Sequence, residues 1–337
     1  MNHSPSPRAL LDDLRNTWFA PAGGPTGGAP RIGMEAEAIV VDRQTRRPFP
    51  IEPGLTASAT APVLHALAAK HRWHVRQSPK SQTPEFTLPD GGRLSFEPGG
   101  QIEYSSAPRR SASEVLRSAR QTFRLVGDAL EREGAALLFT GIDPANAVED
   151  TTLQLRGERY LHMDRHFWRA GPFGARMMRQ SASVQVSLDW GEPAERPRRW
   201  RLLNALAPFL AAIFANSPVY EHAPTGHRSF RRLVWDRLDP LRTGVRDCGG
   251  DPIGSYFAFA LGAPAILLPN GERPAAPFSR WVDTGCVTLA DWHAHLSTLF
   301  PEVRPRGYLE VRTVDALPPE WFAAPLALRL HKPLGEG

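Results

Sequence analysis

The 337-residue chain lacks the features that mark membrane proteins and disulfide-stabilised proteins. Its only cysteines, Cys248 and Cys286, are too few for a disulfide framework or a thiolate zinc site. No apolar run approaches the roughly 18 residues that a membrane span needs. The first 20 residues contain Asp12 and Asp13 and no cleavage-type signal. We therefore expect a cytoplasmic protein that does not enter a membrane.

Several motifs are absent as well. There is no Gly-x-x-x-x-Gly-Lys loop, no Gly-x-Gly-x-x-Gly turn between a strand and a helix, and no Gly-x-Ser-x-Gly elbow. His293 and His295 lack His-Glu-x-x-His spacing and are interpreted as structural or surface residues. The net charge of +5 permits anionic small molecules. The arginines of residues 196–201 alternate at the start of an apolar helix, which indicates a solvated face and no nucleic-acid partner.

The chain is expected to have two parts. Residues 1–30 would form a short helix over residues 8–20 followed by a flexible Gly/Pro linker, and residues 31–337 a single domain. The clearest helix spans residues 111–133, with Ser111 and Glu114 at capping-box spacing and a glycine just beyond its end. Further helices are predicted at residues 61–71 and at 200–215 (interrupted by Pro208), and strands at 32–42, 93–105 (a hairpin), 135–140, 181–189 and 307–314.

Several of these strands alternate between polar and apolar residues. Such alternation is typical of antiparallel sheets that bury one face only. We therefore predict an α+β fold with a mainly antiparallel sheet and helices packed on its outer, apolar face.

Pairs of carboxylates on the predicted strands are the most informative feature. Residues two apart in a strand point the same way, so Glu35 and Glu37 share one face, and so do Gln101 and Glu103, with Glu97 close by. Charges gathered in this way repel one another and lose solvation. A cation between them is expected, and hard carboxylate oxygens favour Mg²⁺ or Mn²⁺.

The same polar alternation recurs far along the chain. Gln185 lies on the polar side of one later strand, and Glu310 and Arg312 lie on the polar side of another. Any one of these strands could simply have a solvated outer face. If the strands are neighbours, they form an acidic trough whose metals could hold nucleotide phosphates, with Arg312 neutralising a transferred phosphoryl group.

A second group of candidate residues lies in the segment of residues 215–244. Its arginines and acids surround Trp235 in a stretch that reads as a loop. One interpretation is a surface loop of mixed charge. The other is a site for amino-acid carboxylates, which the fork of an arginine binds in a bidentate manner.

Six segments together resemble the glutamate–cysteine ligases of the plant and proteobacterial type, a group that includes the actinobacterial ligases of ergothioneine synthesis. In order they read GMEAEAIV, SFEPGGQIEYSSAP, SVQVSLD, FANSP, RRLVWDRLDPLRTG and RGYLEVRTVD, and they extend from about residue 31 to residue 315. The resemblance implies a glutamine-synthetase-like curved sheet that binds ATP and Mg²⁺ on its concave face. It implies that residues 31–337 form a ligase domain with a shortened C-terminal helical part.

The resemblance also implies an activity in glutathione or ergothioneine biosynthesis. The γ-carboxylate of glutamate would be phosphorylated by ATP, and the amine of cysteine would then displace phosphate. Open alternatives are a ligase of the same mechanism with another amine, and a non-catalytic ATP-binding relative. An acid–base hydrolase is less favoured, because the acids are too many for a two-carboxylate mechanism.

By the same match, individual residues acquire expected roles. The expected metal ligands are Glu35, Glu37, Glu97, Glu103 and Glu310. Gln185 would line the metal–phosphate site, Arg312 would steady the γ-phosphate, and Arg231 would bind a substrate carboxylate. The residues expected to shape the amino-acid pocket are Trp235, Arg242, Tyr160 and Met163.

Overall fold

The computed structural model describes residues 4–21, 30–54, 58–79, 81–244, 251–267 and 276–327. Its centre is an open sheet in the order β10-β11-β7-β1-β5-β4-β3-β2, with β6 also paired to β1, and every strand pair in these ranges is antiparallel. The strands are β1 (Ile32–Asp42), β2 (His74–Gln77), β3 (Pro84–Thr87), β4 (Arg93–Phe96), β5 (Ile102–Ser105), β6 (Ala135–Leu138), β7 (Ser183–Leu188), β10 (Val303–Pro305) and β11 (Leu309–Asp315). The predicted α+β class is confirmed.

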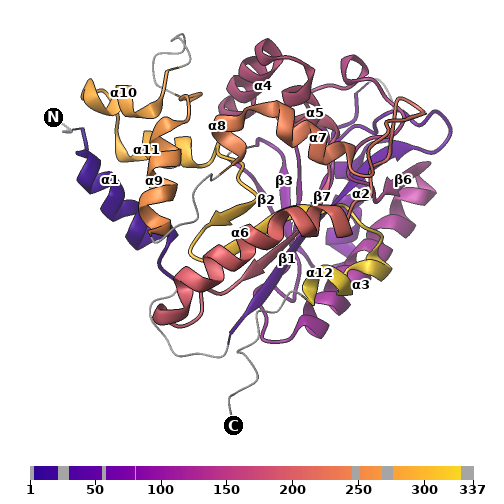
Figure 1. Ribbon diagram of the computed structural model, residues 1–337. Helices are drawn as coiled ribbons and strands as arrows, with labels where there is room; N and C mark the ends of the chain where they lie inside the picture. Colours follow the sequence, from indigo (N-terminus) through magenta and orange to yellow (C-terminus); the bar gives the residue numbers. More distant parts are fainter. Residues whose placement is uncertain are drawn as a thin grey trace.

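Helices α2 (Thr60–His71), α3 (Ala112–Arg132), α6 (Arg196–Ile213) and α12 (Ala323–Leu326) lie around the sheet, and α3 and α6 run across one side of it (Figure 1). The predicted apolar stripe of α3, from Val115 to Leu130, is buried and packs toward β1 and β6. Facing it are the apolar residues of the central strands, such as Ala36, Val184 and Ile102. Alternation along each strand therefore buries one face and leaves the other for polar side chains.

Two details of the helix predictions are wrong. Ser111 makes no capping hydrogen bond to the backbone of α3, because its hydroxyl pairs with that of Ser113 at 2.6 Å. Helix α6 continues through Pro208, which was expected to interrupt it. The predicted glycine end of α3 is confirmed, since Gly134 has a φ of +78° that disfavours a side chain.

A second group of helices lies at the other side of the sheet, α4 (Glu158–Ala170), α5 (Pro172–Gln180) and α7 (Phe230–Leu238). They share a small apolar core built from residues such as Met178 and Val234. Figure 1 shows them above the upper end of the strands. The outer face is thus not the only face with helices, and the additional group forms a roof over part of the polar face.

Most of the remaining helices form a flank beside α6. They are α1 (Pro7–Asp13), the π-helical turn Leu14–Trp18, α8 (Pro240–Thr243), α9 (Pro252–Gly262), α10 (Phe278–Asp283) and α11 (Leu289–Leu296). The short hairpin of β8 (Val219–Tyr220) and β9 (Ala223–Pro224) lies with the second group instead, where Tyr220 stacks on Phe230 of α7. Leu10 and Leu14 are buried as the N-terminal helix prediction requires, and Asp13 contacts His293 on α11 at 2.9 Å. The predicted linker of residues 21–30 lies almost wholly outside the described residues. None of the described helices is long and apolar enough to cross a membrane.

Candidate active site

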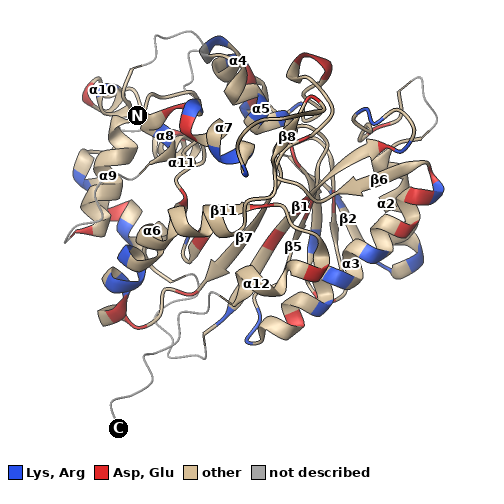
Figure 2. Cartoon of the chain, turned by 45° about the vertical axis from the view of Figure 1, so that its right-hand side comes forward, with Lys and Arg blue, Asp and Glu red and all other residues tan. Residues whose placement is uncertain are grey.

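The register of the central strands places the expected carboxylates on one face of the sheet. Glu37 on β1 lies opposite Glu103 on β5, and Glu35 lies opposite Gln185 on β7. Glu310 on β11 lies opposite Ser187, the next residue of the same parity on β7. Acidic positions are visible on the strands around β1 and β5, well inside the outline of the molecule (Figure 2). The sheet therefore brings together residues that are up to 275 positions apart, from 35 to 310.

A chain of hydrogen bonds crosses this face from strand to strand. Glu37 accepts from the backbone N–H of Ser183 at 2.8 Å, from its hydroxyl at 3.1 Å and from Gln185 Nε2 at 3.1 Å. Gln185 Oε1 in turn accepts from Arg312 Nη1 at 2.6 Å. Arg312 Nη1 also donates to Glu310 Oε2 at 2.9 Å. The amide of Gln185 thus links a carboxylate on one strand to a guanidinium on another.

Four glutamates of the face resist ionisation in this arrangement. Burial, followed by the charges of Glu103 and Glu310, raises the pKa of Glu35 to about 8. Burial and neighbouring carboxylates also raise the pKa values of Glu97 and Glu103. Burial raises the pKa of Glu37 as well, although Arg231 and Arg312 oppose the shift. If all four ionised together, they would place negative charge on the face that its own arginines do not fully compensate.

Glu310 is the exception on this face. Burial opposes its ionisation, but the guanidinium groups of Arg304 and Arg312 outweigh that effect and lower its pKa to about 2. Arg304 Nε donates to Glu310 Oε2 at 2.7 Å, and Arg306 Nη1 lies 3.7 Å from the other carboxylate oxygen. Glu310 is therefore ionised and held by arginines at neutral pH.

The chemistry of these donors fits a hard divalent cation. The five expected ligands all offer carboxylate oxygens, which Mg²⁺ and Mn²⁺ prefer. Glu310 Oε1 is buried without a hydrogen-bond partner. The raised pKa of Glu35 reflects burial first and then the charges of Glu103 and Glu310, and a bound cation would offset both effects. As placed, no three His, Cys, Asp or Glu side chains within the described ranges converge closely enough to hold an ion. Binding would require the carboxylates to move toward one another.

A pocket of about 90 Å³ opens between the polar face and the roof of α4, α5 and α7. Glu37 and Glu97 form part of its floor. Its other lining residues include Arg159, Tyr160, Met163, Arg231, Trp235 and Arg312. The pocket therefore unites two expected metal ligands, the expected phosphate-contacting arginine, and most of the residues expected to bind the amino acid.

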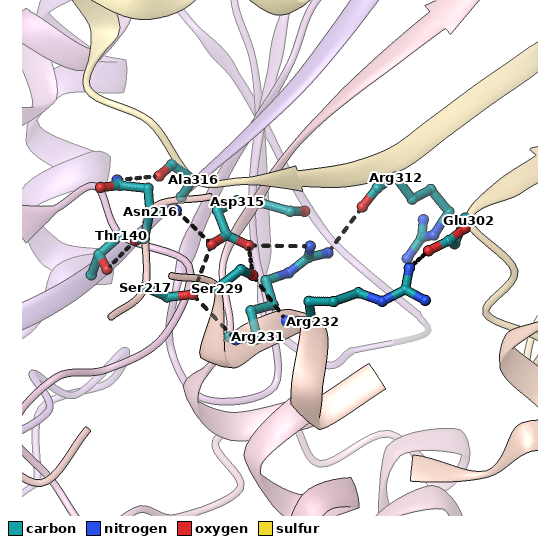
Figure 3. Close-up of polar contacts among 12 residues, drawn as sticks. Thr140, Asn216, Ser217, Ser229, Arg231, Arg232, Glu302, Arg312, Asp315 and Ala316 are labelled. Carbon is teal, nitrogen blue, oxygen red and sulfur yellow. Dashed lines mark hydrogen bonds and ion pairs between the residues drawn. The ribbon is translucent and has the colours of Figure 1, made fainter. Parts of the chain in front are cut away.

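Two pocket arginines have unused hydrogen-bond donors. The Nε groups of Arg231 and Arg312 are buried and have no partner among the described residues. The guanidinium of Arg231 lies over the ring of Trp235, 4.5 Å from its centroid, and its Nη2 donates to the backbone carbonyl of Arg312 at 3.1 Å (Figure 3). Buried donors without partners are costly, so an anionic ligand that accepts from them would bind favourably.

The roof supplies a third arginine. Arg159 on α4 donates to the backbone carbonyl of Ser297 at 2.7 Å and to its hydroxyl at 3.2 Å, and it lies over the ring of Tyr160. Burial lowers the pKa of Arg159, whereas the nearby Glu97 acts in the opposite direction. Together with Met163, this corner gives the pocket a wall that is part basic and part apolar.

Among the residues expected to bind the amino acid, Arg242 is the one that the structure places away from the pocket. Its fully buried side chain pairs with Asp239 at 3.0 Å and donates to the Thr298 hydroxyl at 3.1 Å. It also donates to the backbone carbonyl of Pro264 and is not among the residues that line the pocket. The role expected for Arg242 in shaping the pocket is therefore corrected to one of fixing α8 beside the end of α9.

Other important residues were not singled out from the sequence. Arg304 has the same parity as Glu310, but Pro305 and Gly307 between them hid the hairpin of β10 and β11. Ser183 was seen only as one polar residue of an alternating strand, yet it makes two hydrogen bonds to Glu37. No local signal in the sequence marked Asp315, the roof residues Met177 and Met178 on α5, or Phe300, which lines the pocket beside them.

Among solved structures, the fold resembles that of a glutamate–cysteine ligase from Francisella tularensis in complex with AMP. The TM-score is 0.50 at 12% sequence identity, covering 85% of this chain and 61% of that one. At this identity the likeness shows a common fold alone. The mainly antiparallel sheet and its surrounding helices therefore share the α+β architecture of that structure.

The chain belongs to glutamate–cysteine ligase family 2 (GCS2), a family of ligase enzymes, which it matches over residues 31–331. It is 33% identical over 322 residues to the glutamate–cysteine ligase EgtA of Mycolicibacterium smegmatis, covering 90% of this chain and 69% of that protein. It is 31% identical over 310 residues to the chloroplastic glutamate–cysteine ligase of Solanum lycopersicum, covering 86% of this chain and 56% of that protein. The chain thus spans between about half and about two thirds of the length of these relatives.

Proposed function

We propose that this chain is an ATP-dependent ligase that joins the γ-carboxylate of glutamate to the amine of cysteine and forms γ-glutamylcysteine, ADP and phosphate. The observation that carries the proposal is the pocket in which Glu37 and Glu97 meet Arg231 and Arg312 with unused buried donors. Such a site offers acidic groups for a cation and basic groups for anionic substrates. The family membership supports the choice of glutamate and cysteine.

The polar face would serve the nucleotide. Mg²⁺, for which Mn²⁺ could substitute, supplies neutralisation of phosphate charge when bound. The residues that would hold it are Glu35, Glu37, Glu97, Glu103 and Glu310. Arg312, which already has an unpartnered Nε, would donate to the γ-phosphoryl group of ATP. Gln185 would orient Arg312 through its 2.6 Å hydrogen bond.

The reaction would proceed in two displacements. A γ-carboxylate oxygen of glutamate attacks the γ-phosphorus of ATP, the bond to the β–γ bridging oxygen breaks, and ADP leaves with that electron pair. The amine nitrogen of cysteine then attacks the acyl carbon, phosphate leaves with the electrons of the C–O bond, and the nitrogen loses a proton. Phosphorylation is needed because a free carboxylate has no adequate leaving group. Holding both reactants in one pocket lowers the entropic part of the barrier.

The amino-acid substrate would be held by the roof. Arg231 would bind a substrate carboxylate, since its side chain is 4% exposed and faces the pocket from α7. Trp235, one turn further along the same helix, and Tyr160 and Met163 on α4 would enclose the remainder of the substrate. These contacts would exclude water from the acyl phosphate, which water would otherwise hydrolyse.

The proposal is tested by ADP release from purified protein with ATP, Mg²⁺, glutamate and cysteine, and with each component omitted in turn. We expect turnover only with the complete mixture, and a product with the mass of γ-glutamylcysteine. Glu97→Gln should lower turnover by about 10²-fold or more, whereas the matched change Glu131→Gln on the exposed surface of α3 should leave it unchanged. ADP release no higher than in the single-substrate controls would contradict the proposal.

The same assay separates the alternatives. Turnover with glutamate and another amine, but not with cysteine, would indicate a ligase of the same mechanism with a different acceptor. Thermal stabilisation by ATP without turnover under any mixture would indicate a nucleotide-binding relative that is not catalytic.

A further inference from the structure

Asp315 is a buried carboxylate at the end of β11 that does not line the pocket but organises one of its arginines. Its side chain is 1% exposed. Oδ2 accepts from the backbone N–H of Asn216 at 2.8 Å and from the Ser217 hydroxyl at 2.7 Å, and Oδ1 accepts from the Ser229 hydroxyl at 3.0 Å. Oδ1 also lies 3.7 Å from Arg231 Nη1 (Figure 3).

The two hydroxyls connect Asp315 to the first turn of α7. The Ser217 hydroxyl accepts from the backbone N–H of Arg231 at 3.2 Å, and the Ser229 hydroxyl accepts from that of Arg232 at 3.0 Å. The first backbone N–H groups of a helix have no partner within the helix, so these two hydroxyls satisfy them. Each hydroxyl then donates its own proton to the carboxylate of Asp315, whose charge also suits the positive end of the helix.

This arrangement determines where α7 points its side chains. Arg231 and Trp235 lie one helical turn apart and both line the pocket. Arg232 is not among the lining residues and pairs with Glu302 (Figure 3). A rotation of α7 by one residue would therefore exchange Arg231 for a side chain that now lies outside the pocket. Asp315 fixes this rotation relative to β11, the strand that also carries Arg312.

The surroundings leave Asp315 little freedom. Asn216 Nδ2 donates to the backbone carbonyls of Phe139 and Ala316, both at 2.8 Å, which holds the Asn216–Ser217 segment against the end of β11. A Cβ atom on Gly141 would overlap the carboxylate of Asp315. Glycine at this position thus gives the carboxylate the space it occupies.

We propose that Asp315 is a positioning residue, which with Ser217 and Ser229 docks α7 on β11 and aims Arg231 at the carboxylate of one amino-acid substrate. The inference rests on the proposed function, in which Arg231 binds that carboxylate. The ion pair with Asp315 is longer than a hydrogen bond, and Arg231 Nε has no partner, so the arginine keeps donors for a ligand while its position is fixed.

The test is steady-state kinetics of Asp315→Asn, Ser229→Ala and Ser229→Thr, with KM measured separately for glutamate, cysteine and ATP. We expect Asp315→Asn to raise KM for one amino acid by about tenfold and Ser229→Ala by about threefold, with KM for ATP within about twofold of wild type. Ser229→Thr keeps the hydroxyl and should behave as wild type. Gly141→Ala, which displaces the carboxylate, should resemble Asp315→Asn.

A matched control is Thr288→Ala, because Thr288 caps α11 in the same way but lies away from the pocket. It removes a comparable cap and should leave all three KM values unchanged. If Asp315→Asn does not fold, Ser229→Ala against this control carries the test. The proposal would be overturned if Asp315→Asn and Ser229→Ala left every KM unchanged. It would also be overturned if they raised the KM values for glutamate, cysteine and ATP equally.

Calorimetric titration with glutamate and with cysteine makes the result independent of turnover. If wild type binds an amino acid without turning over and Asp315→Asn loses that binding, the positioning role stands and the proposed function fails. If wild type turns over and the variants bind as tightly as wild type, the proposed function stands and the positioning role fails. A wild-type chain that binds neither amino acid would overturn the positioning role.

Discussion

At the scale of single residues, Glu35 and Glu310 show that one sheet face can hold carboxylates in opposite electrostatic states. Burial, and after it the charges of Glu103 and Glu310, raises the pKa of Glu35 to about 8. Glu310 has three arginines around it, and its pKa is lowered to about 2. The same substitution at the two positions should therefore have opposite effects on stability.

We expect Glu35→Gln to stabilise the metal-free protein at pH 8 and Glu310→Gln to destabilise it, each by about 1–3 kcal/mol. The penalty from Glu35 is absent below its ordinary pKa of 4.5 and grows until the pH exceeds about 8. The stability from Glu310 is fully present above 4.5 and is lost as the pH falls toward 2. The gain from Glu35→Gln should thus fade by pH 5, and the loss from Glu310→Gln should persist there.

Urea unfolding in EDTA at pH 8 and pH 5 measures both effects, with Glu131→Gln as the exposed control. Two losses of similar size at pH 8 would show that packing dominates at these positions and would contradict the electrostatic account.

At the scale of elements, the segment of residues 215–244 is the clearest difference between expectation and structure. It was expected to be a loop because of its many charges, but it contains α7 and α8. Ser229 and Asp239 cap the two helices with their side chains. Phe230, Val234 and Leu238 are spaced by four residues and form the buried stripe of α7. The charged residues between them concealed this period.

The contacts of Arg242 indicate that it stabilises the fold around α8. We expect Arg242→Met to destabilise the protein by about 3 kcal/mol, because it leaves Asp239 without its partner and removes hydrogen bonds to Thr298 and Pro264. Since Arg242 does not line the pocket, KM values measured well below the unfolding temperature should stay at the wild-type level. A rise in KM for an amino acid with unchanged stability would restore Arg242 to the substrate site.

At the scale of the whole molecule, the sheet was easier to predict than the pocket. Alternation in strands such as residues 32–42 and 181–189 is a local property, and it determined which face would be buried. Pairing then placed Glu35 opposite Gln185 and Glu37 opposite Glu103 without further information. The pocket depends on how α4, α5 and α7 pack on that face. The charge state of Glu310 depends on Arg304, which reaches it across a hairpin. These contacts arise from tertiary packing and have no signature in any short segment.

We propose that this site activates a carboxylate by transferring a phosphoryl group to it. The most direct test uses glutamate with a heavy oxygen isotope in its γ-carboxylate, turned over with ATP, Mg²⁺ and cysteine. Because the C–O bond to phosphate breaks in the second step, we predict that one heavy oxygen atom appears in each inorganic phosphate released, as mass spectrometry would detect. Turnover that releases only unlabelled phosphate would contradict the account.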